Sequence, residues 1–270
     1  AALAIKQAIE DGDISGTIRF YGCPEEETLV GKVFMAREGV FDDLDACLTW
    51  HPLNTNAPRM YSHLAMTSVK FYFEGVSAHA AASPQSGRSA LDAVELMNVG
   101  SNYLREHILD KARIHYSIEK GGEEPNVVPD EAIVWYYIRA PKRYQVDSIF
   151  ERVKKIAKGA AMMTETDVTW KIQSSCYNTL HNKVLSYLLL DNMKEIGGPA
   201  FTGEDREFAK KLEQTLEDKE SVMKPRGVPD ELIELALHEK PVEKPFGEDK
   251  IMPGSTDVGD VSWITPLAQM

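Results

Sequence analysis

Three consecutive glutamates, Glu25 to Glu27, follow a short apolar segment, residues 16–21, that is typical of a buried strand. A histidine, His51, follows the next apolar segment, residues 46–50, in the same way. In open α/β sheets the carboxyl ends of the strands are where ligands and catalytic groups gather. Carboxylates beside an imidazole suit a hydrolytic metal site, in which some groups coordinate and another carboxylate accepts a proton. The pattern therefore predicts a metal-dependent hydrolase.

Simpler interpretations of the same residues remain open. Consecutive glutamates also occur in solvated acidic loops, and a histidine at a strand end can simply satisfy its own hydrogen bonds. Pro24 favours the functional interpretation because its ring rigidifies the turn that presents the acids. A cation between adjacent carboxylates also relieves their repulsion. The sequence does not decide which of the three glutamates is the base and which a ligand.

Length, charge and cysteine content narrow the class of protein. The 270 residues suffice for one large domain or two smaller ones. A net charge of −12 argues against nucleic acid or an anionic membrane as the partner, because both require a basic surface. The three cysteines are widely spaced and form neither a disulfide framework nor a metal motif. We therefore expect a cytoplasmic protein.

The predicted elements change character along the chain. Residues 1–50 alternate helix and strand, which predicts a mostly parallel sheet with helices on both faces. The next elements have the β-α-β-β-α-β order of a ferredoxin-like unit. Their predicted ranges are strand 66–75, helix 88–107, strand 112–119, strand 131–138, helix 144–160 and strand 166–174.

After this unit the α/β pattern resumes with a helix over residues 183–196. We therefore expect an α/β catalytic domain in two parts with an inserted ferredoxin-like α+β domain. The expected ranges are 1–62 for the first part, 63–177 for the insertion and 178–270 for the second part. Alternating charge between residues 203 and 250 predicts two amphipathic surface helices, over 207–216 and 229–238.

Four motifs make the chain resemble the two-metal zinc or manganese peptidases, which include aminoacylases, carboxypeptidase G and amidohydrolases of N-acyl amino acids. They occur in the family's order and spacing and span most of the chain. The motifs are Pro24-Glu25-Glu26-Glu27, Trp50-His51, residues 75–80 with Pro84, Gly87 and Arg88, and Gly121-Gly122 with residues 125–130. The resemblance implies a zinc-peptidase-like catalytic domain and an inserted lid that also serves in dimerisation.

The resemblance also implies roles for residues of the first two motifs and of the lid. Glu26 corresponds to the general base, and Glu27 and His51 correspond to metal ligands. His79 corresponds to the lid histidine that polarises the scissile carbonyl, often in the active site of the neighbouring protomer. Without the resemblance, His79 is simply a loop histidine.

Three further residues correspond to substrate-binding positions. Asn126 resembles the lid asparagine that binds a substrate carboxylate or oxyanion. Arg139 resembles an arginine that grips the α-carboxylate of the substrate, a role that the fork of the guanidinium suits. Ser255 lies in a Gly-Ser-x-Asp segment, residues 254–257, that resembles part of the pocket; an Asx-type turn explains this segment nearly as well.

The resemblance implies an amidohydrolase that cleaves the amide between an acyl or aroyl group and an amino acid, with p-aminobenzoyl-glutamate as the expected substrate. Two divalent metal ions, Zn or Mn, are the expected cofactors. The expected assembly is a homodimer through the lid or a heterodimer with a related chain. One alternative is a dipeptidase or aminoacylase of the same family. Another is a non-catalytic partner whose lid mainly dimerises.

The chain departs from the family in its number of metal ligands. The family's first ligand motif falls upstream of residue 1 and its last ligand histidine downstream of residue 270, so we expect an internal fragment. Of about five ligand groups, only Glu27 and His51 are expected here. The other histidines, His63, His107, His115, His181 and His238, fall on predicted lid or helix positions. We therefore expect an incomplete or empty metal site and an inactive fragment.

Overall fold

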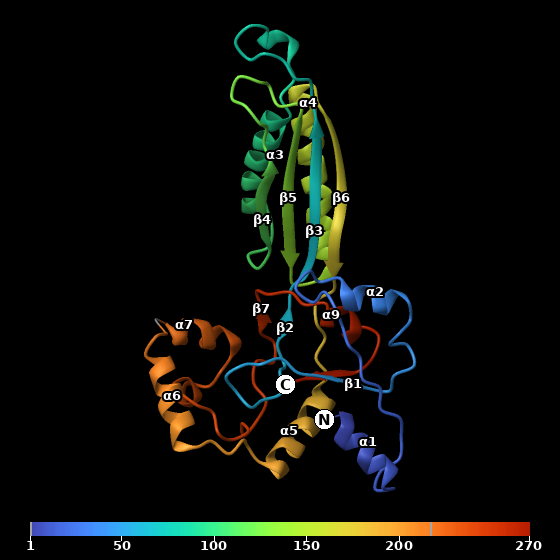
Figure 1. Ribbon diagram of the computed structural model, residues 1–270, viewed down its shortest axis with the longest axis vertical. Coiled ribbons are helices and arrows are strands. Elements are labelled where there is room, and N and C mark those ends of the chain that lie inside the picture. The colour runs from blue at the N-terminus through green and yellow to red at the C-terminus, as the bar shows by residue number, and fades with distance from the viewer. Residues whose placement is uncertain (1, 217) are drawn as a thin grey trace.

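The computed structural model describes residues 2–216 and 218–270, and the predicted start of the first helix at Ala1 lies outside the described residues. An elongated α+β unit, residues 65–176, projects from a broader part of the molecule that holds both ends of the chain (Figure 1). No helix among the described residues combines the length and the apolar character that crossing a membrane requires.

The α+β unit is a four-stranded antiparallel sheet with two helices on one face (Figure 1). The strand order is β4-β5-β3-β6, as in a ferredoxin-like fold. Its elements, in chain order, are β3 (Ala65–Glu74), α3 (Ala90–Leu104), β4 (Arg113–Lys120), β5 (Glu131–Ala140), α4 (Arg143–Thr164) and β6 (Asp167–Cys176). The predicted order and type of all six elements are confirmed, with most ends within a few residues of the predicted ones.

The core of this unit follows from alternation along its central strands. Phe71 and Phe73 of β3, and Val134 and Tyr136 of β5, point to the helix-covered face and are fully buried. Alternate side chains of a strand face opposite sides of a sheet, so one side of each strand meets α3 and α4. The Tyr136 hydroxyl donates to Asn98 Oδ1 at 2.6 Å, which satisfies its polar group inside the core.

The remaining part contains short parallel strand pairs surrounded by helices. Strand β1 pairs with β8, and β2 pairs with β7. The elements before the α+β unit are α1 (Ala2–Glu10), α2 (Gly31–Arg37), β1 (Cys47–Thr49) and β2 (Ser62–His63). Those after it are α5 (Lys183–Ile196), α6 (Gly203–Glu213), α7 (Lys219–Met223), α8 (Asp230–Ile233), β7 (Ile251–Met252), α9 (Val258–Ser262) and β8 (Leu267–Gln269).

The expected mixed α/β class is confirmed, but the predicted strand at residues 16–21 is wrong. This segment has no regular secondary structure, and its apolar side chains Ile18 and Phe20 are 43% and 84% exposed. A strand requires hydrogen bonds from a neighbouring chain segment. None of the backbone–backbone hydrogen bonds found among the described residues involves residues 16–21.

The two predicted surface helices also shift. Helix α6 begins at Gly203, four residues before the predicted start, because Thr202 and Asp205 form a capping box at its N-terminus. The predicted helix over 229–238 is reduced to the four residues of α8. The chain then leaves the helix, with Ile233 buried against Met223 and Val228.

Candidate active site

The glutamate loop, residues 25–29, is a tight turn that leads into α2. Glu25 and Leu29 have left-handed backbone angles, φ 55° and 58°, which residues with a side chain rarely adopt. The Leu29 N–H donates to the Glu26 carbonyl at 2.9 Å and closes the turn. Glu25 and Glu27 are exposed, whereas Glu26 is half-buried. The turn therefore gives Glu26 an environment different from that of its two neighbours.

The segment of residues 254–257 contacts this loop from the far end of the chain. Thr256 Oγ1 donates to Glu26 Oε1 at 2.9 Å. Asp257 is fully buried and accepts hydrogen bonds from Lys32, the second residue of α2. The Ser255 hydroxyl is also buried, and it has no hydrogen-bond partner among the described residues. The fold thus brings Glu26 and the predicted pocket segment together.

His51 lies at the end of β1, as predicted, and is exposed. Its backbone N–H donates to the Met270 carbonyl at 2.9 Å, and its Nδ1 lies 3.0 Å from the Pro52 carbonyl oxygen. The Arg59 guanidinium donates to the His51 carbonyl at 2.8 Å. These contacts fix the backbone of His51 and leave Nε2 as the ring atom for a ligand.

His63 is a candidate active-site residue that the sequence did not suggest. It was expected at a lid position, but it lies on β2, which pairs with β7 just before residues 254–257. Its Nδ1 is 3.2 Å from Thr179 Oγ1, and the Leu64 N–H donates to the Gly254 carbonyl. Burial, with smaller contributions from Arg59 and His51, lowers the pKa of His63 to about 4. His63 is therefore a neutral imidazole beside the pocket segment at physiological pH.

His63 makes the stability of this region depend on pH. Its pKa of about 4 lies below the ordinary value of 6.5, so between these values the unfolded chain binds the proton more readily. The free energy of unfolding therefore rises with pH across this window, by up to about 1.4 kcal/mol per pH unit. Burial raises the pKa of Asp260 to about 6, which produces the opposite slope between pH 3.8 and 6.

Urea unfolding of the wild type and of His63→Asn from pH 4 to 7 separates these contributions, since the variant keeps Asp260. The stability advantage of the wild type over the variant should grow with pH up to about 6.5. An advantage that stays constant across the window would contradict the assignment of a buried neutral imidazole.

Two predicted site residues, His79 and Asn126, lie together at the distal tip of the α+β unit. His79 bridges to Val127, and the Ala80 N–H donates to the Asn126 carbonyl at 2.8 Å. Ten-residue strands separate this tip from the glutamate loop (Figure 1). At about 3.3 Å per residue, that separation is about 30 Å. Within one chain, His79 and Asn126 are therefore not brought to Glu26.

Arg139 lies at the opposite, proximal end of β5, in register with Met66 of β3 and Arg113 of β4. Its guanidinium carbon is 5.4 Å from the centre of the Tyr137 ring, and its Nε is buried without a hydrogen-bond partner among the described residues. The predicted substrate-binding residues thus divide between the two ends of the α+β unit.

The described residues do not assemble a complete metal site. No group of three or more His, Cys, Asp or Glu side chains is arranged to hold an ion in this part of the chain. Catalytic zinc sites use three protein ligands, so the predicted pair Glu27 and His51 does not fit a resident ion by itself.

Elemental analysis after exhaustive dialysis tests the metal affinity of this chain. We expect well under one equivalent of zinc or manganese, because two donors cannot enclose an ion tightly. Stoichiometric, tightly held metal would contradict this expectation.

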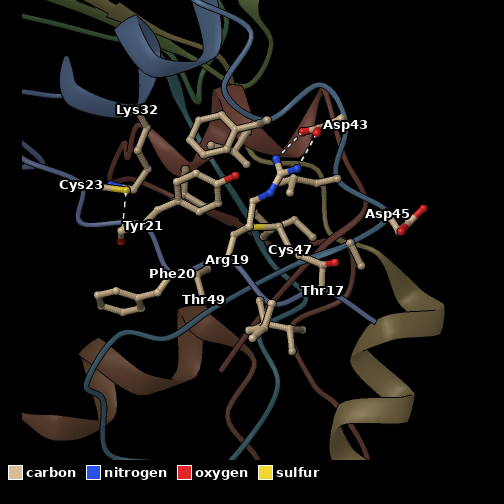
Figure 2. Close-up of a pocket in the computed structure, with 18 of the residues that line it drawn as sticks. Thr17, Arg19, Phe20, Tyr21, Cys23, Lys32, Asp43, Asp45, Cys47 and Thr49 are labelled. Atoms are coloured by element: carbon tan, nitrogen blue, oxygen red, sulfur yellow. Dashed lines mark hydrogen bonds and ion pairs between the residues drawn. The ribbon is translucent and has the colours of Figure 1, made fainter. Parts of the chain in front are cut away.

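One groove, of about 810 Å³, is not lined by any residue of the glutamate loop. It lies between residues 16–23 and β1, and Figure 2 shows Arg19 and Asp43 facing each other across a two-point ion pair. Both nitrogen–oxygen distances are 2.6 Å, and the bond from Arg19 lowers the pKa of Asp43. Neither the three glutamates nor His51 line this groove.

Comparison with known proteins places this architecture in a class. Residues 61–163 match the model of a peptidase dimerisation domain. The crystal structure of an aminobenzoyl-glutamate utilization protein from Klebsiella pneumoniae has the same fold. It matches with a TM-score of 0.63 and 21% identity, over 99% of this chain and 60% of that chain. The chain therefore carries the dimerisation domain of a peptidase family, in a fold that it shares with that protein.

Two relatives are also similar to this chain in sequence beyond the dimerisation domain. The sequence is 44% identical over 280 residues to one subunit of the p-aminobenzoyl-glutamate hydrolase of Escherichia coli (strain K12), covering 100% of this chain and 58% of that protein. It is 31% identical over 203 residues to the Xaa-Arg dipeptidase of Mus musculus, covering 73% of this chain and 46% of that protein. The chain spans less than two thirds of either relative.

Proposed function

We propose that the whole protein is an amidohydrolase that splits p-aminobenzoyl-glutamate into p-aminobenzoate and glutamate. The observation that carries this proposal is the identity of 44% to a hydrolase subunit, which extends over the whole chain. The hydrogen bond between Thr256 and Glu26 supports it, because it joins one motif of the family resemblance to the segment that resembles part of the family's pocket. Members of this family typically bind divalent metal ions.

Glu26 is the general base of this reaction. It removes a proton from a water molecule as the water oxygen attacks the amide carbon, and the proton passes to the leaving nitrogen when the C–N bond breaks. Thr256 occupies Oε1, so Oε2 is the oxygen that accepts the proton. Glu27 and His51 are proposed ligands to zinc or manganese. A metal bound there would supply Lewis-acid chemistry.

The proposed lid comprises residues 63–177. Each active site contacts its substrate through residues of two protomers. His79 and Asn126 are about 30 Å from the glutamate loop of their own chain, so they serve the active site of the partner. There the His79 copy polarises the amide carbonyl and the Asn126 copy binds a carboxylate or oxyanion. Arg139, at the proximal end of β5, and Ser255, next to Thr256, bind substrate in the active site of their own chain. The domain match at residues 61–163 supports a dimer.

The partner is either a second copy or a related chain. Two Escherichia coli relatives are named as different subunits of one p-aminobenzoyl-glutamate hydrolase, which favours a heterodimer. The less similar of the two is 26% identical over 170 residues, or 61% of this chain. The three free cysteines support a cytoplasmic location.

The rates of hydrolysis of p-aminobenzoyl-glutamate and of Xaa-Arg dipeptides by the whole protein test the substrate. We expect faster release of p-aminobenzoate from the first. The second candidate function is that of a dipeptidase, which the similarity to the Xaa-Arg dipeptidase favours. Faster cleavage of the dipeptides would support it. If the protein cleaved neither substrate, even when it was combined with the less similar Escherichia coli relative, a non-catalytic dimerisation partner would be favoured.

A further inference from the structure

The Lys32–Asp257 ion pair is buried next to the glutamate loop, and the proposed reaction does not use it. Lys32 Nζ lies 2.8 Å from Asp257 Oδ1, and the Lys32 backbone N–H donates to Oδ2 at 2.9 Å. The side chain of Lys32 is 13% exposed and that of Asp257 is 0% exposed. One carboxylate thus binds both the side chain and the backbone of the second residue of α2.

Stability alone is a weak reason for this pair. Removing two charges from water is expensive, and a buried ion pair is often no more stabilising than apolar residues of the same size. The geometry of the pair does fix the position of the first turn of α2. Asp257 satisfies an otherwise unpaired N–H in the first turn of α2, a position that favours negative charge. The start of α2 is therefore tied to a segment 225 residues away.

Thr256, the neighbour of Asp257, binds the glutamate loop that precedes α2. Thr256 Oγ1 donates to Glu26 Oε1 at 2.9 Å and accepts from the Val258 N–H at 3.4 Å. Because the threonine oxygen accepts on one side, its proton is directed toward the glutamate. Residues 256 and 257 thus bind both Glu26 and Lys32.

The turn that contains Glu26 is strained. Glu25 and Leu29 both have positive φ, a conformation that is unfavourable for residues with a side chain. A strained turn persists only when its surroundings hold it. The contacts from Thr256 and Asp257 are two such restraints, and Lys32 also lines one end of the groove in Figure 2.

We propose that Thr256, Asp257 and Lys32 are positioning residues for Glu26. They hold the strained turn so that Glu26 Oε1 is bound and Oε2 faces the reacting water. This inference rests on the proposed function, because it takes Glu26 as the base. Under this proposal the Lys32–Asp257 ion pair contributes to the reaction by holding the base in place.

Steady-state kinetics of four variants of the whole protein test the inference. Thr256→Val and Lys32→Met should each lower kcat about tenfold or more, with KM within twofold of the wild type, because substrate still binds but the base is misplaced. Thr256→Ser keeps the hydroxyl and should restore kcat to within threefold. Lys183→Met is the matched control, because Lys183 pairs with Glu248 at the same 2.8 Å distance but on the surface. It should leave kcat unchanged.

A second measurement does not depend on activity. Hydrogen exchange of the backbone in residues 26–33 should quicken in Thr256→Val and Asp257→Asn but not in Lys183→Met. The inference would be overturned if Thr256→Val left kcat unchanged or altered only KM. It would also be overturned if Thr256→Ser failed to restore kcat, or if hydrogen exchange did not change. If the wild type itself cleaves no amide, the proposed function fails, and the exchange measurement still decides whether these residues hold the turn.

Discussion

A Glu26→Gln variant of the whole protein is expected to lose between about 10²-fold and 10⁴-fold in kcat, with little change in KM. Glutamine keeps a carbonyl oxygen that can accept from Thr256, so the turn is retained. It cannot take up a proton, and the loss of a general base typically has an effect of this size. Release of p-aminobenzoate measures the rate, and the thermal midpoint of unfolding shows that the variant remains folded.

Glu25→Gln is the matched control, because it makes the same chemical change one residue earlier. Glu25 is exposed, and its carboxylate accepts only from Thr28 Oγ1 among the hydrogen bonds of the described residues. We expect kcat within about threefold of the wild type. If Glu25→Gln were inactive and Glu26→Gln active, the base would lie one position earlier in the triplet, an alternative that the sequence left open.

The α+β unit could be predicted from the sequence because its signals are local. Alternate residues of β5, including Val134, Tyr136 and Ile138, are apolar and buried, so the pattern alone indicates a strand with one covered face. The helix ends are also marked locally, as at Ser89, whose side chain accepts from the Asp92 N–H at the start of α3.

The failed strand at residues 16–21 shows where local signals end. Its apolar pattern is that of a strand, but a strand forms only with a neighbour that supplies hydrogen bonds, and the segment runs exposed along the groove of Figure 2. The apolar pattern shows only that these residues favour a strand. Whether a neighbouring strand is available to pair with them depends on the whole fold.

The same limit applies to the site. The family resemblance assigned roles to Glu26 and Ser255, with the order of base and ligand left open, but the 2.9 Å contact between Thr256 and Glu26 joins residues 230 positions apart. Nor does the sequence distinguish His63 from an ordinary lid histidine. Only its pairing on β2 places it beside the pocket segment.

A Gly31→Ala variant is expected to lose about 3 kcal/mol or more of folding free energy in the part of the molecule outside the α+β unit. A Cβ at position 31 would lie 1.8 Å from the Pro24 carbonyl oxygen. That oxygen belongs to the backbone and cannot rotate away, so α2 or the glutamate loop must move. Overpacking in well-packed regions costs typically about 1 to 3 kcal/mol, and a backbone clash lies at the upper end.

Gly203→Ala is the matched control within the same part of the molecule. A Cβ at position 203, the first residue of α6, meets nothing within 4 Å. Alanine is also the better helix former, so the control should change stability by no more than about 1 kcal/mol, in the stabilising direction. Urea unfolding followed by tryptophan fluorescence compares the two variants. Equal stabilities would mean that α2 does not pack against Pro24 as the structure shows. A selective loss in Gly31→Ala would show that the close approach of α2 to Pro24 holds the glutamate loop in place.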